Sequence, residues 1–453
     1  MKIIIVGAGE VGYHFAEWLA QEKKEVVVID ISPESLQRVS DHLDVQIMTG
    51  SGANPRVLEE SGLKSADIIL AVTDKDEVNL IACFFANVIA PHIQKVALIR
   101  NPDYISYREA LTRDILNIGL VINPEMEVVN SILRIMSAPE VEEVNEFVGG
   151  RIKMLGKHLP ADSPLNGLKL MQLPDMIERN RMIIAALVRD EQLIIPKGKD
   201  TLRAGDFVYF VCQSRDIEEI LRLFGKRANS LKNILVVGGG NIGFPLVREL
   251  ENRRFNVKLI EKDPHRCQMI SAKLNRTLVL QGLATDQKFL EEENIGHMDM
   301  VVAVTWDEEM NILSCLLAKQ LGAKKTIARV NKVPYIPLVK AIGIDHIVSP
   351  RISAINTIFP YMRRGKVISS VSIRGKAAEV LEAEALPKSA IVGKPLKDLE
   401  FPKEALFLCI FRGDEVIIPA GNTVIEPGDR VLILSTGAVI PLVEQALMGK
   451  RSA

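Results

Sequence analysis

The first part of the chain alternates short aliphatic runs with segments of helical period. After the first run, apolar residues recur at Val11, Phe15 and Leu19, a spacing that predicts an amphipathic helix. A Ser-Pro pair then opens the stretch SPESLQRV, as is typical of a helix start. Runs that are apolar throughout and separated by helices favour a parallel sheet covered on both faces. The expected strands are KIIIVGA from Lys2, EVVVID from Glu25, VQIMTG from Val45, ADIILAVT from Ala66 and KVALIR from Lys95.

The pattern returns in the second half of the chain. With Gly7 set against Gly238, GAGEVG aligns with GGGNIG, and Asp30 aligns with Glu261. LAVTDKDEVNLIAC then aligns with VAVTWDEEMNILSC, and LIRN with IARVN. Further along, IIPKGKDTLRAGDFVYF aligns with IIPAGNTVIEPGDRVLI. Agreement of this extent implies that a two-domain unit was duplicated.

The expected fold class is α/β, with two Rossmann-like, doubly wound parallel-sheet domains, each followed by a small α+β module. The modules are expected because Gly-Asp turns precede short alternating strands in LRAGDFVYFV and IEPGDRVLIL. The joints are expected near Pro139, in GKRANS before Leu231, and near Gly365. The predicted sheet domains are residues 1–138 and 230–364, and the predicted modules are residues 144–224 and 367–453.

Charge and composition disfavour nucleic-acid binding, a membrane-spanning chain and a zinc site. The formal net charge is -1, so no positive field would draw the protein to nucleic acid, which is not an expected partner. No run reaches the roughly 18–20 apolar residues of a membrane helix. The most apolar stretch, LIACFFANVIA from Leu80, is expected to be a buried helix. The N-terminus lacks the pattern of a secretion signal, which favours the cytoplasm, and the five cysteines form no CxxC pair that would predict a zinc site.

The glycine loop of the first half follows a predicted strand, begins a predicted helix and precedes an acid at the end of the next strand. This is the context of a dinucleotide-binding loop. Gly7 would allow the tight turn, Gly9 would let a diphosphate approach the backbone, and Gly12 would let the helix pack on the sheet. Asp30 would accept hydrogen bonds from the two ribose hydroxyls, and its charge disfavours NADP. The alternative is that these glycines only fit helix to sheet.

The second loop repeats this arrangement. Adenosine and a diphosphate are common to NAD, NADH, ATP and ADP, so the pattern leaves all four open as ligands. The variable loop positions contain no basic residue, which favours NAD or NADH at the first site. The predicted cofactor-binding residues of the two loops are Gly7, Ala8, Gly9, Glu10, Val11, Gly12 and Asp30, and Gly238, Gly239, Gly240, Asn241, Ile242, Gly243 and Glu261.

No catalytic centre is predicted. A dehydrogenase needs a proton donor or acceptor beside the nicotinamide, often a histidine. The seven histidines share no pattern between the halves, and the sequence contains no GxSxG, HExxH or Walker A motif. The prediction is a sensor and not an enzyme. The competing hypotheses are an NAD-dependent oxidoreductase of unknown substrate and a scaffold whose loops bind nothing.

The repeated glycine loop, the distal acid, the AVT and Arg-Asn segments and the Gly-Asp module together resemble the domains that regulate potassium conductance. Two such units in tandem, over nearly the whole chain, resemble the TrkA family of nucleotide-binding subunits of Trk potassium uptake systems. The resemblance implies a cytoplasmic protein, peripheral on the inner face of the membrane, that forms a homo-oligomer, either a dimer or a tetramer ring. Nucleotide binding would change its shape and control a potassium-translocating membrane subunit of the Trk type.

The resemblance also implies further site residues. Thr73 and Asp74 lie where the family lines its pocket, and Thr305 takes the same place in the second half. Arg100 is placed to meet phosphate, although it can equally form a surface ion pair.

One further position is a candidate cation ligand. Glu125, in NPE, matches a family position where an acid lies near the phosphates or a bound cation, although it can also act as a helix N-terminal charge. The second half has Arg351 in that place, which disfavours a cation there.

Two unequal pockets would let one chain read two signals, such as redox state and energy charge, because each ligand shifts the shape by its difference in affinity. The segments VVNSILRIM and ISAINTIFPYM have apolar faces at helical spacing. They are suited either to docking a neighbour or to packing on their own domain.

Overall fold

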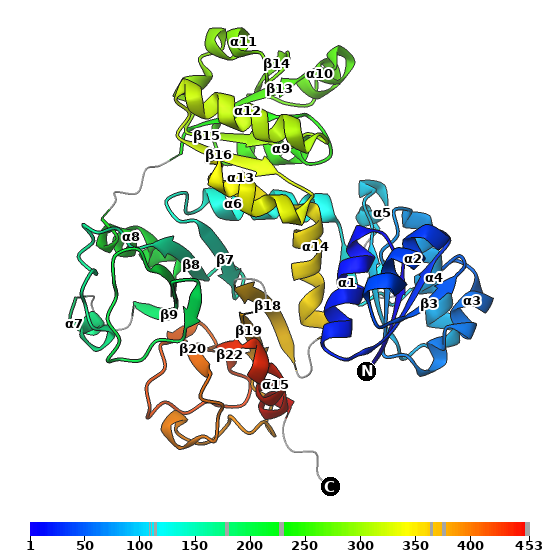
Figure 1. The fold of residues 1–453 in the computed structure, drawn as a ribbon, viewed down its shortest axis with the longest axis vertical. Coiled ribbons are helices and arrows are strands. Elements are labelled where there is room, and N and C mark those ends of the chain that lie inside the picture. The colour runs from blue at the N-terminus through cyan, green and yellow to red at the C-terminus, as the bar shows by residue number, and fades with distance from the viewer. Residues whose placement is uncertain are drawn as a thin grey trace. The chain divides into compact units, whose positions relative to one another are not determined.

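The computed structural model describes residues 1–107, 109, 111–112, 116–176, 181–225, 231–362, 366–373 and 377–448. These residues form two six-stranded sheets and two five-stranded sheets, in alternation along the chain (Figure 1). The predicted fold class is confirmed. The expected joints at residues 226–230 and 363–365 lie outside the described residues.

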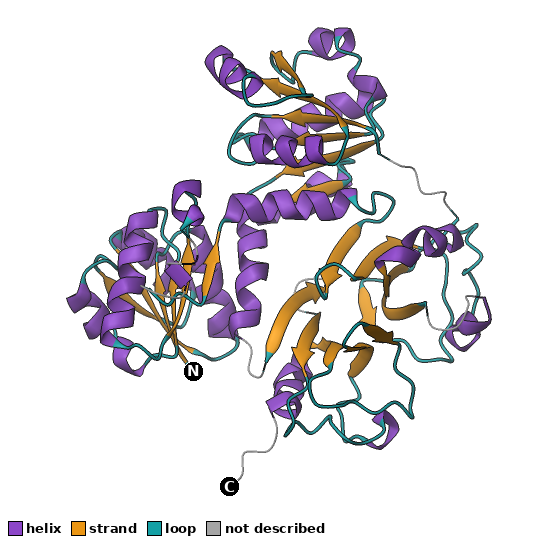
Figure 2. Cartoon of the chain, turned by 180° about the vertical axis from the view of Figure 1, so that it is seen from behind, coloured by secondary structure: helices purple, strands orange, loops and turns teal. Residues whose placement is uncertain are grey.

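The first sheet has the strand order β3-β2-β1-β4-β5-β6, and helices cover both of its faces (Figure 2). Parallel pairs join β1 to β2 on one side and to β4 on the other, so the strand order reverses beside β1. A reversal of this kind opens a crevice at the carboxyl ends of the strands. The elements are β1 (Lys2–Val6), α1 (Glu10–Gln21), β2 (Glu25–Asp30), α2 (Pro33–His42), β3 (Gln46–Thr49), α3 (Pro55–Glu60), β4 (Ile68–Ala71), α4 (Asp76–Ile89), β5 (Gln94–Leu98), α5 (Pro102–Ser106), β6 (Leu120–Ile122) and α6 (Pro124–Met136).

The third sheet repeats the first, in the order β14-β13-β12-β15-β16-β17. Here β12 pairs in parallel with β13 on one side and with β15 on the other. The elements are β12 (Asn233–Val237), α9 (Gly243–Asn252), β13 (Asn256–Glu261), α10 (Pro264–Ser271), β14 (Leu278–Gln281), α11 (Gln287–Glu292), β15 (Met300–Ala303), α12 (Glu308–Leu321), β16 (Lys325–Arg329), α13 (Ile336–Ala341), β17 (His346–Val348) and α14 (Pro350–Ile358).

The predicted Ser-Pro helix start is confirmed. The Ser32 hydroxyl accepts a hydrogen bond from the Ser35 backbone at 3.2 Å, and Pro33 is the first residue of α2. In the second half, Asp263 caps α10 in the same way, with Pro264 as its first residue. A capping side chain satisfies a backbone N–H that has no partner inside the helix.

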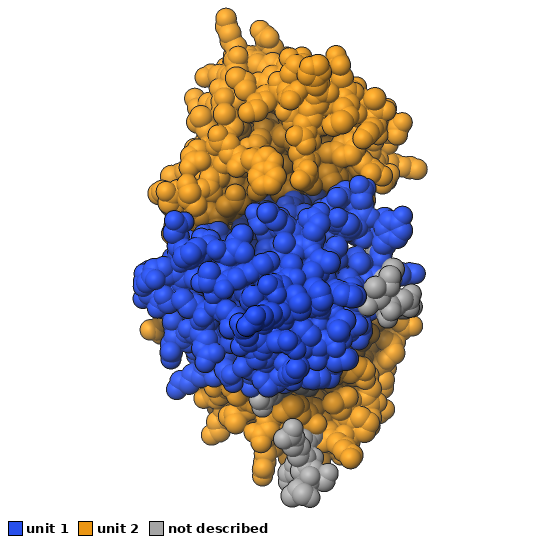
Figure 3. Space-filling view, turned by 90° about the vertical axis from the view of Figure 1, so that its right-hand side faces the viewer, with its two compact units in different colours: residues 1–130, 348–358 blue, residues 131–347, 359–453 orange. Residues whose placement is uncertain are grey.

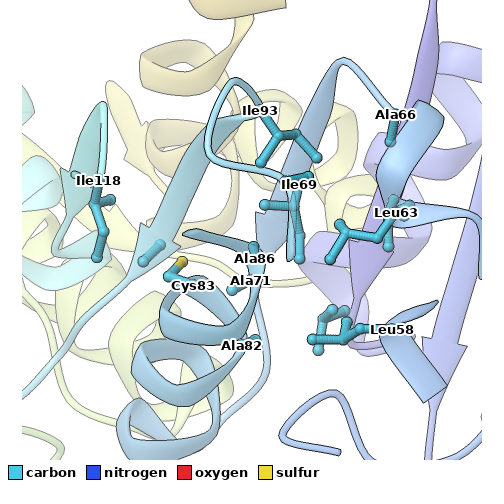
Figure 4. Close-up of a cluster of buried hydrophobic side chains, with 14 of the residues drawn as sticks. Leu58, Leu63, Ala66, Ile69, Ala71, Ala82, Cys83, Ala86, Ile93 and Ile118 are labelled. Atoms are coloured by element: carbon cyan, nitrogen blue, oxygen red, sulfur yellow. The ribbon is translucent and has the colours of Figure 1, made fainter. Parts of the chain in front are cut away.

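Helix α4 packs one face against the first sheet. Ala82, Cys83 and Ala86 of this helix are fully buried there, among Ile69 and Ala71 of β4 (Figure 4). Burial raises the pKa of the Cys83 thiol to about 12. The helix was expected to be buried, but its outer face exposes Phe84 by 39% and Val88 by 62%. It is therefore amphipathic, because only one face meets the sheet.

The two modules are antiparallel sheets, in the orders β10-β9-β11-β8-β7 and β18-β19-β22-β20-β21. The first contains β7 (Glu143–Phe147), β8 (Ile152–His158), α7 (Leu173–Met176), β9 (Met182–Arg189), β10 (Gln192–Ile194), β11 (Phe207–Gln213) and α8 (Ile217–Leu223). The second contains β18 (Val367–Ile373), β19 (Ala378–Glu384), β20 (Ala405–Arg412), β21 (Glu415–Ile417), β22 (Arg430–Thr436) and α15 (Ile440–Met448).

The modules pack against each other within the chain. One buried cluster joins Phe147 and Tyr209 of the first module to Leu408 and Phe411 of the second. At the edge of this cluster, Arg151 forms an ion pair with Asp414 at 2.7 Å. The apolar face of each sheet is therefore covered by the other sheet, and neither of these faces would be covered in an isolated module.

Helix α14 follows the second sheet in sequence but packs on the first, against α1 and β6. The chain divides into two compact units, residues 1–130 with 348–358 and residues 131–347 with 359–453 (Figure 3). Ala354 and Ile358 of α14 are fully buried. The helix therefore does not pack on the sheet domain that precedes it in sequence but on the first sheet domain of the same chain.

None of the described helices is both long enough and apolar enough to cross a membrane.

The Gly-Asp turn of each module is closed by an Arg-Asp pair. Arg189 donates from Nε and Nη2 to the two carboxylate oxygens of Asp206, both at 2.7 Å, and Arg412 does the same to Asp429 at 3.0 and 2.9 Å. Burial alone would raise the pKa of Asp206. The hydrogen bonds from Arg189 and from the Arg203 backbone outweigh burial and hold that pKa below its usual range.

We expect Arg189→Ala to lower the free energy of unfolding by about 3 kcal/mol, because it leaves the buried Asp206 carboxylate without its partner. Urea unfolding followed by circular dichroism would measure the change. Since the pKa of Asp206 is depressed in the folded state, its contribution is present above pH about 4 and is lost as the pH falls further. The control is Arg181→Ala, which removes a surface pair with Glu219 and should cost about 0.5 kcal/mol or less. Equal effects of the two substitutions would contradict the prediction.

Candidate functional site

Each crevice begins with a glycine loop whose first and third glycines are required by the fold. Gly7 has φ of 112° and Gly238 has φ of 98°, a region that other residues rarely adopt. A Cβ atom at Gly12 would lie 1.8 Å from the Gly7 carbonyl oxygen, and one at Gly243 would lie 1.8 Å from that of Gly238. The first turn of α1 therefore packs directly on the backbone at Gly7, and the first turn of α9 packs directly on the backbone at Gly238.

The middle glycine of each loop is different. Gly9 has φ of −65° and ψ of −172°, which any residue can adopt. A Cβ at Gly9 would meet no atom within 4 Å, and one at Gly240 would meet only Nε1 of Trp306, at 4.0 Å. Neither backbone strain nor packing among the described residues requires glycine at these two positions.

An acid at the end of the second strand holds each loop. Asp30 accepts hydrogen bonds from the backbone N–H groups of Ala8 at 2.5 Å and Ser32 at 2.8 Å. Glu261 accepts from Gly239 at 2.8 Å and from the two backbone N–H groups that follow it. Each carboxylate oxygen has more than one lone pair, so the same acids can also accept hydrogen bonds from ligand hydroxyls.

The opposite rim of each crevice is held by a buried asparagine. Asn79 accepts from the backbone N–H and the hydroxyl of Thr73, at 2.9 and 2.7 Å, and donates to the Leu98 carbonyl at 2.9 Å. Asn311 makes the corresponding bonds to Thr305, at 2.8 and 2.7 Å. Both asparagines are fully buried. They fix the loop after β4 and β15 to the neighbouring strand.

An arginine stands beside each threonine. Arg100 donates from Nη1 to the Thr73 carbonyl at 3.1 Å, and Arg329 donates to the Thr305 carbonyl at 3.2 Å. The Nε atom of Arg100 also lies 3.8 Å from Glu125. The two arginines therefore lie at the rims of the two crevices, where a cation can meet an anionic ligand.

The remaining predicted residues lie around these two crevices. In the first half, Glu10 and Val11 form the first turn of α1, and Asp74 is exposed just beyond β4. In the second half, Asn241 is exposed and Ile242 is buried, directly before α9. All the predicted cofactor-binding residues thus lie at the carboxyl ends of the two parallel sheets, on the loops after the first, second, fourth and fifth strands and on the first turns of α1 and α9.

Basic side chains reach the first loop from elsewhere in the chain. The Glu10 carboxylate pairs with Arg38 at 2.8 Å and also with Arg351 of α14. Arg351 donates from Nη1 to Nε2 of His14 at 3.1 Å. The loop itself has no basic residue, but Arg38 and Arg351 lie beside it and bring positive charge that the loop sequence alone does not show.

Glu125 remains a candidate cation ligand. It is buried, and its Oε2 atom has no hydrogen-bond partner in the described part of the chain. Within that part, no three His, Cys, Asp or Glu side chains gather where a metal ion could be held. Its counterpart Arg351 is occupied by the pair with Glu10.

Sequence reasoning missed several residues of these rims. Asn79 and Asn311 occupy the same place in the aligned segments of the two halves, so the repeat itself carried their signal. Arg100 was predicted and Arg329 was not; Arg329 stands two places earlier along its strand than Arg100, because Asn311 donates to the Arg329 carbonyl whereas Asn79 donates to that of Leu98. Trp306, which is 65% exposed, was also overlooked; it takes the place of Asp74.

Similarity to known proteins extends over the chain. The TrkA-N domain matches residues 3–124 and 234–350, and the TrkA-C domain matches residues 158–225 and 380–447. The chain belongs to the TrkA family. This confirms the resemblance seen in the sequence.

TrkA relatives match at nearly full length. The Trk system potassium uptake protein TrkA homolog 1 of Methanosarcina mazei is 38% identical over 452 residues, which cover 98% of this chain and 99% of the relative. The Trk system potassium uptake protein TrkA of Halomonas elongata is 36% identical over 436 residues, covering 96% and 95%.

Two solved structures share the fold of this TrkA chain. The GsuK RCK domain has a TM-score of 0.59 at 16% identity and covers 98% of this chain and 94% of its own. The GsuK channel bound to NAD has a TM-score of 0.61 at 18% identity and covers 98% and 78%. At this identity the likeness concerns the fold.

We expect Asn79→Ala to destabilise the first unit of this TrkA chain by about 3 kcal/mol, because it leaves the buried Thr73 N–H and Leu98 carbonyl without partners. Thermal unfolding would measure the loss. Asn87→Ala, on the partly exposed side of the same helix, is the matched control and should change stability by about 0.5 kcal/mol or less. An Asn79→Ala protein as stable as the control would show that the asparagine does not hold the rim.

Proposed function

We propose that this chain is a regulatory subunit that binds NAD or NADH, with ATP and ADP as further candidate ligands, in its two glycine-loop crevices. Binding changes the conformation of the chain, and that change controls a potassium-translocating membrane subunit of the Trk type. The subunit is cytoplasmic and peripheral on the inner face of the membrane, and it acts as a dimer or a tetramer ring.

The observation that carries the proposal is the pair of middle glycines. Gly9 and Gly240 occupy the same place in two copies of one loop, yet a Cβ at either position would meet no closer atom than Nε1 of Trp306 at 4.0 Å. The space above each is the place where a diphosphate approaches the backbone in a loop of this type. A ligand accounts for both glycines, whereas the fit of helix to sheet accounts only for the first and third.

The charges support an adenine nucleotide. Backbone N–H groups at the starts of α1 and α9 favour an anion, and Arg100 and Arg329 add positive charge at the opposite rims. Asp30 and Glu261 lie at the ends of β2 and β13, where the ribose hydroxyls of adenosine are held in loops of this kind. The GsuK channel that shares the fold was solved bound to NAD.

A signalling role is favoured over catalysis by what surrounds the crevices. The described rim residues are held by structural hydrogen bonds: Asp30 and Glu261 bind backbone N–H groups, the two asparagines bind threonines, and the two arginines bind threonine carbonyls. His14, the histidine on α1, contacts Glu17 and Arg351 on the side of that helix. The alternative, an NAD-dependent oxidoreductase, predicts steady consumption of NADH with a small substrate, which absorbance at the nicotinamide band would detect.

The membrane partner is proposed from the relatives, which are named as potassium uptake proteins of the Trk system. Copurification with a Trk-type membrane subunit tests it, and light scattering of the purified chain tests the oligomer. A chain that stays monomeric and copurifies with no such subunit would contradict this part of the proposal.

Gly9→Ala and Gly240→Ala should each fold normally and lose affinity for NAD and ADP by about tenfold or more at the altered crevice, because a methyl group would overlap the diphosphate. Calorimetric titration measures the affinity, and thermal unfolding without ligand measures the fold. For the wild-type chain, ligand at about 100 times its Kd should stabilise the fold by about 2.7 kcal/mol.

Two control substitutions accompany this experiment. Gly421→Ala adds a methyl group in ordinary contact with Lys397, far from the loops in sequence, and should change neither folding nor binding. Gly12→Ala should unfold the first sheet domain, since its Cβ would lie 1.8 Å from a carbonyl oxygen. Undiminished binding by Gly9→Ala and Gly240→Ala would refute the nucleotide site.

A further inference from the structure

We propose that Trp306 is a stacking platform for the nicotinamide ring, and that it makes the second crevice a site for a nicotinamide dinucleotide in preference to ADP or ATP. The inference rests on the proposed function, since it requires that the second glycine loop binds a nucleotide. It adds the part of the ligand that the glycine loop does not recognise.

The indole is held in place beside the loop. Trp306 follows the end of β15 and is 65% exposed, yet the Arg329 guanidinium lies over its ring at 4.5 Å from the centroid. Arg329 is in turn held by its bond to the Thr305 carbonyl. The indole Nε1 lies 4.0 Å from the position of a Cβ at Gly240. An exposed aromatic ring thus stands beside the glycine loop, on the β15 side of the crevice.

The strand order decides which part of a ligand this ring would meet. In the second parallel sheet, β13 and β15 lie on opposite sides of β12, whose end carries the glycine loop. A dinucleotide lies across such a reversal, with one nucleoside on each side. Glu261, at the end of β13, takes the adenosine. The second nucleoside then extends past the phosphates to the β15 side, where Trp306 lies.

The chemistry of the indole fits a ring and not a phosphate. The Arg329 guanidinium lies over one face of the indole, and the opposite face offers an aromatic surface on which an electron-poor ring can stack, whereas a phosphate cannot. Stacking of two aromatic rings is expected to change affinity by about three- to tenfold. ADP and ATP end in phosphates and offer nothing to stack there.

The first crevice lacks this platform. Asp74 takes the corresponding position, just beyond β4, and is exposed. A carboxylate cannot stack on a ring, so the first crevice has no comparable means of selecting the nicotinamide end. The two crevices therefore differ in the part of the ligand that their side chains recognise.

The experiment uses fluorescence of the full-length chain. The protein has two tryptophans, and Trp18 is buried in α1, so Trp18→Phe leaves Trp306 as the reporter of its own crevice. The chain is titrated with NAD⁺ and with ADP-ribose, which is NAD⁺ without the nicotinamide. We expect NAD⁺ to quench Trp306 and to bind the second crevice about three- to tenfold more tightly than ADP-ribose.

Substitutions of Trp306 then test whether the preference for NAD⁺ over ADP-ribose comes from the indole ring. Calorimetric titration of Trp306→Ala should show that NAD⁺ has lost its advantage at one crevice while ADP-ribose binds as before. Trp306→Phe should keep most of the advantage, and Asp74→Ala, the matched change in the first crevice, should leave the second crevice unaltered.

The failures can be told apart. If ADP-ribose binds the second crevice as tightly as NAD⁺, or if Trp306→Ala weakens both ligands equally, the platform is refuted and the nucleotide site stands. If neither ligand changes the fluorescence or releases heat at that crevice, the platform and the nucleotide function of the second crevice are both refuted.

Discussion

In each half of the chain, one carboxylate fixes the loop between the first strand and the first helix. Asp30 and Glu261 bind backbone N–H groups on their own turn and on the glycine loop across the crevice. Without this bond the loop would lose its connection to the second strand, and the N-terminus of the helix would no longer be held over the sheet. The shape of the crevice, the free N–H groups and the room above the middle glycine all depend on it.

On this common frame the two crevices have different rims. The asparagine that holds the threonine is the same in both, and an arginine binds the threonine carbonyl in each, although Arg100 and Arg329 stand at places two residues apart along their strands. What differs is the outermost layer, where the first crevice presents Asp74 and an acidic loop residue paired with arginines, and the second presents Trp306 on Arg329. The groups that shape the loop are thus alike in the two halves, whereas the groups at the outer rim differ.

The sequence predicted the sheets and the loops because their signals are local: an aliphatic run, a Gly-rich turn and an acid a fixed distance on. The repeat added the pairing of the halves, since Gly7 and Gly238 lie in matching segments. It could not predict that Arg351 would meet Glu10, because that pair depends on a helix crossing from one half to the other. Nor could it show that Phe84 faces outward, because the helical period gives the apolar face but not the width of the surface that covers it. The alignment shows that Trp306 stands in the place of Asp74, but it does not indicate a role for the indole. The strand order adds that Trp306 and Glu261 lie on opposite sides of β12.

The position of α14 has a consequence for how the chain can be divided. The helix is encoded with the second sheet and completes the surface of the first, where Ala354 and Ile358 are buried. A fragment that ended after the first module would leave α1 and β6 uncovered, and the complementary fragment would carry an apolar helix with nothing to cover. The sequence is a tandem of two copies, but in the fold a helix from the second copy completes the first sheet domain, so the boundary between the repeats is not a boundary between folded units.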